Sequence, residues 1–223
     1  MELEVKLSFD SRDLLYGLAD SGDFLKYCSD AVKPEPVLLE NTYLDTSDMK
    51  ITGRGGMIRI RHYKGSDKDN YEFTVKYGGG VSEGYHKRYE WNAESEDGKF
   101  SIESFKSLAS SSDDPSDMLS EVFSGIKDED LYTLCSNSFN RTVYNLTYGD
   151  STIEACFDYG LISNSDGSKT DEICELELEL KTGDPSDIAQ LAKIITDKTG
   201  CVPLDNTKYG RTLKLARGTD HEE

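Results

Sequence analysis

Charged and aliphatic residues alternate strictly in two segments that lie far apart in the chain. Residues 2–6 read Glu-Leu-Glu-Val-Lys, and residues 175–179 read Glu-Leu-Glu-Leu-Glu. Because successive side chains of a β-strand point to opposite faces, each segment predicts a strand with one charged face and one apolar face. Such strands are typical of a sheet that encloses a polar interior. Carboxylates gathered in that interior would hold a metal ion.

The composition excludes several classes of function. The 223-residue chain carries a formal net charge of −18, which argues against a nucleic-acid surface and makes an anionic substrate unexpected unless the basic residues are gathered in one place. Its five cysteines contain no Cys-x-x-Cys pair, which predicts reduced cytoplasmic thiols and no zinc site. No apolar run is long enough to span a bilayer, and no signal peptide is recognisable. We therefore expect a soluble, cytoplasmic protein without membrane or nucleic-acid partners.

The pattern of short strands and turns predicts an antiparallel barrel. Runs rich in Val, Ile, Thr, Tyr and Phe predict strands at 2–8, 37–45, 57–63, 71–77, 84–92, 139–147, 151–158, 172–181 and 207–215. Turns are expected at 65–66, 78–80, 149–150 and 165–167. Helices are expected at 10–19, as short pieces within 101–135 around a turn at 110–114, and from 185 to 199. The predicted fold class is α+β, an antiparallel tunnel of about eight or nine strands with helices packed outside.

Charged residues share a face within each of several predicted strands. These sets are Arg59 with Arg61, Glu72 with Lys76, His86 with Arg88 and Glu90, and Glu154 with Asp158. A solvent-exposed sheet face would explain any one of these strands by itself. Their recurrence at strand centres, with apolar residues on the opposite faces, favours one shared polar interior.

An interior with both kinds of charge has a clear chemical use. Arginine presents a planar fork that matches phosphate oxygens, and lysine supplies a point charge. Neighbouring carboxylates repel one another unless they bind a cation, and oxygen ligands select hard ions such as Mg²⁺ or Mn²⁺. Bases together with a carboxylate-bound metal predict a polyphosphate site. The basic residues would then be concentrated inside an otherwise acidic protein.

Several motifs resemble those of the CYTH superfamily, the triphosphate tunnel metalloenzymes, and most closely its bacterial inorganic triphosphatases. They are Glu2-x-Glu4-x-Lys6, Asn41-Thr-Tyr-Leu-Asp45-Thr46, Arg59-x-Arg61, Thr74-x-Lys76, His86-x-Arg88-x-Glu90, Glu154-x-x-x-Asp158-x-Gly160, Glu175-x-Glu177-x-Glu179 and Asn206-Thr207-Lys208-Tyr209-Gly210-Arg211. The resemblance covers nearly the whole chain, so we expect a single domain over residues 1–217 and a frayed tail over 218–223.

The resemblance implies an eight-stranded tunnel that binds triphosphate with Mg²⁺ or Mn²⁺. It assigns phosphate binding and catalysis to Lys6, Arg59, Arg61, Lys76 and Arg88, with Arg141, Lys208 and Arg211 as further phosphate-binding candidates. It assigns metal binding to Glu2, Glu4, Glu177 and Glu179, with support from Glu154, Asp158 and Glu175. Which glutamates of the 175–179 run touch the ion stays open. Glu90 and His86 are possible additions to the site.

The function implied is hydrolysis of tripolyphosphate to pyrophosphate and orthophosphate. The alternatives are hydrolysis or cyclisation of an organic triphosphate, such as thiamine triphosphate or ATP, and a non-catalytic polyphosphate-binding module. Thiamine triphosphate as substrate needs an aromatic surface at the tunnel mouth, which Tyr63, Tyr77 or Trp91 would supply, although packing is the favoured interpretation of each of these residues. Cys156 is interpreted as a small neutral filler between two acids. The oligomeric state is left open.

Overall fold

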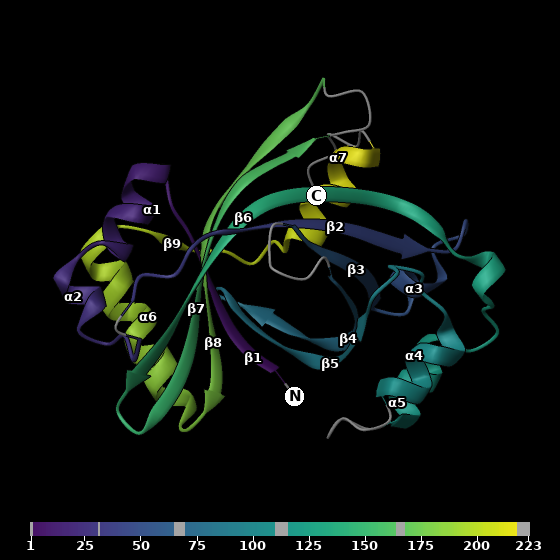
Figure 1. Ribbon diagram of the computed structural model, residues 1–223, viewed down its shortest axis with the longest axis horizontal. Helices are drawn as coiled ribbons and strands as arrows, with labels where there is room; N and C mark the ends of the chain where they lie inside the picture. The colour runs from purple at the N-terminus through teal and green to yellow at the C-terminus, as the bar shows by residue number, and fades with distance from the viewer. Residues whose placement is uncertain (1, 31, 65–69, 110–115, 164–167, 218–223) are drawn as a thin grey trace.

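The protein is built around a closed antiparallel barrel (Figure 1), seen in a computed structural model that describes residues 2–30, 32–64, 70–109, 116–163 and 168–217. Neighbouring strands follow the order β5-β4-β3-β2-β6-β7-β8-β1, and a pairing between β1 and β5 closes the ring. Within the described residues, eight strands form this barrel and a ninth short strand joins β1. The predicted fold class is confirmed.

The strands carry most of the chain's regular structure. They are β1 (Glu2–Ser8), β2 (Val37–Asp45), β3 (Gly56–Lys64), β4 (Asn70–Ser82), β5 (Tyr85–Ser95), β6 (Tyr132–Tyr148), β7 (Ser151–Ser163), β8 (Thr170–Thr182) and β9 (Val202–Pro203). The helices are α1 (Arg12–Ala19), α2 (Gly22–Leu25), α3 (Lys50–Gly53), α4 (Ile102–Ala109), α5 (Ser116–Val122), the 3₁₀ turn η1 (Asp128–Asp130), α6 (Pro185–Thr199) and α7 (Lys208–Arg217).

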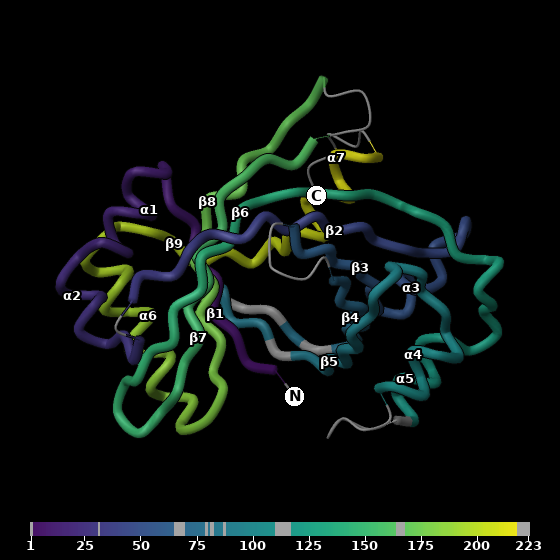
Figure 2. The backbone as a smooth tube through the Cα atoms, in the orientation of Figure 1, coloured from purple at the N-terminus to yellow at the C-terminus, as the bar shows by residue number. Residues whose placement is uncertain are grey.

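The apolar faces of the strands point outward and are covered by helices, as predicted. Figure 2 shows α1, α2 and α6 on one side of the barrel and α4 and α5 on the other. The first group covers the outer faces of β1, β7 and β8, including Val5, Phe157 and Leu178. The second covers the outer faces of β4 and β5, including Phe73 and Trp91. The alternation read from the sequence therefore separates an outer apolar shell from an inner charged surface.

The prediction of a strand at 207–215 is wrong, because residues Lys208–Arg217 form helix α7. The Thr207 hydroxyl caps its first turn by accepting a hydrogen bond from the Gly210 backbone N–H at 3.0 Å. Lys208 and Thr212 lie one turn apart on its buried side. This helical spacing outweighs the strand propensity of the Thr and Tyr residues in the segment. Helix α7 packs against Tyr43 and Cys135, side chains of the inner face of β2 and β6.

Other differences concern element boundaries. Strand β6 begins at Tyr132, within a segment predicted to be helical. The glycines at 78–80 lie inside β4, where the pairing register with β5 shifts, and the hairpin turn follows at Glu83 and Gly84, which both have positive φ. The turn at 149–150 is confirmed. The turns predicted at 65–66, 110–114 and 165–167 and the tail at 218–223 lie outside the described residues. Among the helices described, none is both long and apolar enough to cross a membrane.

Only glycine fits at position 160 of β7, because the backbone there lies very close to β6. An added Cβ atom would lie 2.6 Å from the Phe139 Cβ atom and 2.8 Å from the Ser138 carbonyl oxygen. We expect Gly160→Ala to lower the free energy of unfolding by about 1–3 kcal/mol, as measured by urea denaturation, because the strands must separate. Gly17→Ala in α1 is the control: nothing lies within 4 Å of its added Cβ, and it should stabilise the helix slightly. Equal stabilities for both variants would contradict this account.

Candidate active site

The interior of the barrel holds a cavity of about 630 Å³ that is dominated by charge. Among the described residues, its basic lining consists of Lys6, Arg59, Arg61, Lys76, Arg88, Arg141, Lys181 and Lys208. Its acidic lining consists of Glu2, Glu4, Glu72, Glu90, Glu154, Glu177 and Glu179. The cavity is therefore close to neutral, although the whole chain carries −18. This contrast confirms that the basic residues are concentrated inside.

Strand register places three glutamates in one lateral row on the inner surface. Glu179 of β8 lies directly opposite Glu154 of β7 on one side and Glu4 of β1 on the other. The next row along the tunnel contains Cys156, Glu177 and Lys6 in the same three strands. Directly opposed like charges destabilise a sheet unless something positive lies between them. We call Glu4, Glu154 and Glu179 the acidic row.

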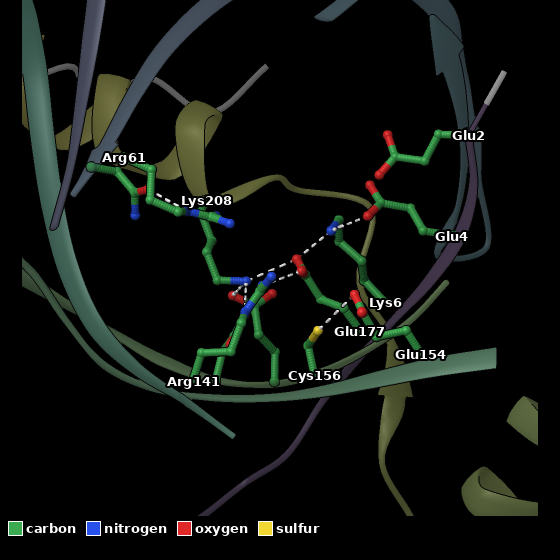
Figure 3. Close-up of polar contacts among 12 residues, drawn as sticks. Glu2, Glu4, Lys6, Arg61, Arg141, Glu154, Cys156, Glu177 and Lys208 are labelled. Atoms are coloured by element: carbon green, nitrogen blue, oxygen red, sulfur yellow. Dashed lines mark hydrogen bonds and ion pairs between the residues drawn. The ribbon is translucent and has the colours of Figure 1, made fainter. Parts of the chain in front are cut away.

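Basic side chains face the acidic row from the other side of the tunnel. Figure 3 shows Arg61, Arg141 and Lys208 on one side, Glu2, Glu4 and Glu154 on the other, and Glu177 between them. Arg61 comes from β3, Arg141 from β6 and Lys208 from α7. We call these two sides the carboxylate wall and the basic wall, and Lys6 and Glu177 bridge them. The carboxylate wall also contains bases, because Lys76 pairs with Glu2, Arg88 with Glu4 and Lys181 with Glu179.

Burial and neighbouring charges perturb the carboxylates strongly. Burial raises the pKa of Glu2 to about 8, against the attraction of Lys76 and with added repulsion from Glu4 and Glu90. Burial also acts to raise the pKa of Glu4, but Lys6, Lys76 and Arg88 lower it to about 2. The pKa of Glu179 is raised by burial, with further repulsion from Glu154. The pKa values therefore indicate incompletely compensated carboxylates at Glu2 and Glu179, whereas the nearby bases stabilise the charge of Glu4.

The basic wall contains an arginine cluster, formed by Arg59, Arg61 and Arg141, in which Arg59 and Arg141 pair closely with carboxylates and Arg61 does so only at a longer distance. Burial lowers the pKa of Arg61, and the neighbouring guanidinium groups of Arg59 and Arg141 lower it further. Arg61 donates from Nε to the Asn41 side-chain oxygen at 3.0 Å, and its guanidinium lies 3.8 Å from a Glu72 carboxylate oxygen. Arginines held this close to one another provide a site for a polyanion.

A buried ionic cluster surrounds Lys208, the first residue of α7. Its ammonium lies 2.7 Å from an Asp158 oxygen, 2.9 Å from a Glu175 oxygen and 2.8 Å from a Glu177 oxygen. Asp158 and Glu175 are fully buried, and Asp158 also receives two hydrogen bonds from Arg141. This cluster joins α7 to the barrel and fixes the positions of Lys208 and Arg141.

Most of the predicted site residues converge on the cavity, and four lie elsewhere. Asp158 and Glu175 lie beneath Lys208 and pair with bases, so the structure places them as supports. Arg211 lies at a second cavity, where its Nε donates to an Asp171 oxygen at 2.6 Å. His86 is fully buried with Nε2 3.1 Å from the Leu204 carbonyl oxygen, so it faces neither solvent nor the tunnel cavity. Burial also lowers its pKa.

The aromatic candidates and Cys156 are the neutral residues considered for the site. Tyr63 lines the cavity, whereas Trp91 is buried in the outer core with Tyr77 against it. Cys156 lines the cavity with its thiol 3.6 Å from a Glu154 oxygen, and burial raises its pKa, which agrees with a neutral filler.

A buried hydrogen-bond chain supports the basic wall and was not predicted. Arg61 donates to Asn41, Asn41 donates to the Asn137 side-chain oxygen at 2.9 Å, and Asn137 donates to the Thr212 hydroxyl at 2.8 Å. These hydrogen bonds link β3, β2 and β6 to α7. The sequence motif at Asn41 was a signal for it, but nothing local identifies a partner that lies 96 residues away.

Lys181 is a second residue that was missed. It lines the cavity, and its ammonium lies 2.8 Å from a Glu179 oxygen and 3.4 Å from a Glu154 oxygen. Its inner-facing parity continues from Glu175, Glu177 and Glu179, so extending the alternation by one more step would have identified it.

The donor chemistry of the carboxylate wall fits a hard divalent cation. Among the described residues, no group of three or more acidic, His or Cys side chains is already arranged as a metal-binding set. Mg²⁺ is commonly held by one or two carboxylates together with substrate phosphates and water, and it does not require an all-protein cage. The raised pKa of Glu2 and the opposed carboxylates of the acidic row are the features that a bound cation would compensate.

The fold and the polar interior define a class of protein, the antiparallel tunnels with opposed acidic and basic walls. The family model for the CYTH domain matches residues 22–212, and the chain belongs to this family. Strand β1 lies outside the matched range, and its pairing with β5 and β8 places it in the barrel.

Individual relatives agree with this assignment. The inorganic triphosphatase of Haemophilus influenzae is 29% identical over 153 residues, which cover 68% of this chain. The chain thereby spans 38% of the length of that relative. A candidate adenylyl cyclase from Hippeastrum, described as having a dominant triphosphatase activity, is 18% identical with a TM-score of 0.65, covering 98% of this chain and 96% of its own. A candidate adenylate cyclase from Bacillus halodurans is 17% identical with a TM-score of 0.58, covering 95% and 96%. At these identities the two structures establish the shared fold alone.

Proposed function

We propose that this protein is a divalent-metal-dependent inorganic triphosphatase, which hydrolyses tripolyphosphate to pyrophosphate and orthophosphate. The observation that carries the proposal is the opposition of the acidic row to the arginine cluster across one cavity. A polyphosphate chain carrying a metal ion complements both walls at once. The name of the Haemophilus influenzae relative and the described activity of the Hippeastrum protein support the same chemistry.

The basic wall would position the substrate. Arg59, Arg61 and Arg141 would bind phosphate oxygens through their planar guanidinium donors. Lys6 and Lys208 would contact the bound polyphosphate with their ammonium groups. Water attacks a terminal phosphorus in line with the bridging oxygen, that P–O bond breaks, and pyrophosphate leaves. Charge that develops on the transferring phosphoryl group is stabilised by donors already held in place, with little reorganisation.

Glu2 and the acidic row would hold the cation, with Glu177 and Glu90 adjacent. When bound, Mg²⁺ or Mn²⁺ supplies charge neutralisation at the phosphate oxygens. Asp158 and Glu175 hold Arg141 and Lys208 in place and would not contact the ion in this arrangement.

A substrate panel tests the proposal. The purified chain would be incubated with tripolyphosphate, pyrophosphate, ATP or thiamine triphosphate, each with Mg²⁺, Mn²⁺ or a chelator, and the products would be identified by ³¹P NMR. We expect equal amounts of orthophosphate and pyrophosphate from tripolyphosphate, faster than turnover of either organic substrate. Chelation should abolish the reaction, and restoring the metal should recover it.

Other results of the substrate panel would favour one of the alternative functions. Faster release of orthophosphate from thiamine triphosphate or ATP than from tripolyphosphate would identify an organic triphosphatase. Tyr63, which lines the cavity, would then be the candidate aromatic contact for the organic group. Cyclic AMP without orthophosphate would identify a cyclase. Binding of tripolyphosphate in calorimetry without turnover in either metal would identify a binding module.

A further inference from the structure

Lys181 lies beside a pair of directly opposed carboxylates, as Lys208 does at Asp158 and Glu175. Glu154 and Glu179 lie directly opposite each other on β7 and β8, and the Lys181 ammonium lies 3.4 Å and 2.8 Å from their carboxylate oxygens. Because opposed carboxylates repel, the ammonium is the positive charge that makes this pair tolerable in the folded protein. Lys181 therefore forms ion pairs with two members of the acidic row.

Exposure separates Lys181 from Lys6 and Lys208. The side chains of Lys6 and Lys208 are 5% and 8% exposed, so both are held inside the ionic network. The Lys181 side chain is 40% exposed, and Glu154 and Glu179 are 28% and 30% exposed. The four-carbon stem of a lysine at a cavity rim can move into solvent without breaking apolar packing.

We propose that Lys181 is a built-in counter-ion of the acidic row, which competes with the divalent cation and lowers the affinity of the site for metal. This inference rests on the proposed function, because it takes the acidic row as part of the metal site. A lysine ammonium and a divalent cation cannot both lie close to the same two carboxylates without strong repulsion. Metal binding therefore requires Lys181 to swing away, and its removal should make metal bind more tightly.

The opposite expectation holds for a lysine that binds substrate. Loss of such a residue weakens binding of the polyphosphate and leaves the affinity for metal alone unchanged. A measurement of metal affinity without substrate separates the two roles, because only a competing ammonium predicts a gain.

Calorimetric titration of Mn²⁺ into the substrate-free full chain provides the test. Lys181→Met and Lys181→Gln both remove the charge, and we expect each to lower the Kd for Mn²⁺ by about tenfold, from the repulsion of one unit charge at roughly 5 Å in a wet environment. Lys181→Arg keeps the charge and should retain a Kd near that of the wild type. Lys193→Met is the matched control, because Lys193 is an exposed α6 lysine paired to Asp197 and should leave the Kd unchanged.

Thermal unfolding supplies a second readout. In chelator, Lys181→Met should melt at a lower temperature than the wild type, because Glu154 and Glu179 lose their counter-ion. Saturating Mn²⁺ should raise its midpoint by more than it raises that of the wild type.

The outcomes distinguish this inference from the proposed function. Equal or weaker Mn²⁺ binding by both charge-removing variants, with a wild type that binds Mn²⁺ and hydrolyses tripolyphosphate, would overturn the role of Lys181 alone. A wild type that neither binds Mn²⁺ nor hydrolyses tripolyphosphate would overturn the metal site and this inference with it.

Discussion

Lys208→Met should lower the free energy of unfolding by about 3–5 kcal/mol, the largest stability loss expected of a single substitution in this site. The Lys208 ammonium lies within 2.9 Å of oxygens from Asp158, Glu175 and Glu177, two of which are fully buried residues. Its removal leaves buried carboxylates with less compensation, and Met keeps the unbranched apolar stem. Urea denaturation of the purified variant measures the loss.

Lys214→Met is the matched control for this prediction. Lys214 is an exposed lysine of the same helix, and its substitution should change stability by no more than about 0.5 kcal/mol. If both variants unfolded at the same urea concentration, the ionic cluster would not be what joins α7 to the barrel.

Arg61→Gln should reduce tripolyphosphate turnover by about 10²–10³-fold while changing stability little, by analogy with the loss of one donor to transition-state charge. Burial and the neighbouring guanidinium groups of Arg59 and Arg141 lower the pKa of Arg61, so the free protein gains little from this charge. Gln can still donate to the Asn41 oxygen, which lies 3.0 Å from the arginine Nε. Steady-state kinetics with tripolyphosphate and saturating Mg²⁺ would show the loss.

A catalytic role for Arg61 requires a large loss of turnover together with a small change in stability. Lys193→Gln removes one positive charge at a side chain that is 72% exposed, and it should retain wild-type turnover. Full activity of Arg61→Gln would mean that the basic wall does not bind the transferring phosphate. A stability loss as large as that of Lys208→Met would mean that Arg61 is a structural cation.

The alternation of charged and apolar residues was enough to predict the barrel and most of its inner surface. In β1, β3, β4 and β8 the inward parity follows directly from the strand period, so Lys6, Arg59, Lys76 and Glu177 were placed correctly. The family resemblance added the strand number of eight and the expectation that the polyphosphate is a triphosphate.

Features that depend on distant partners could not be predicted in the same way. Asp158 and Glu175 share the inward parity, but helix α7 covers them with Lys208, and α7 had been predicted as a strand. His86 has the same parity as Arg88, yet the segment at Leu204 covers it. Parity determines which face a side chain takes, and only the tertiary structure determines what covers that face.

Anomalous diffraction from crystals grown with Mn²⁺ and tripolyphosphate would test the opposed-wall account most directly. The account predicts a manganese peak bonded to carboxylate oxygens of the acidic row, with phosphate density between that peak and Arg61. A tunnel without manganese, or polyphosphate bound only on the outer surface of the barrel, would contradict it.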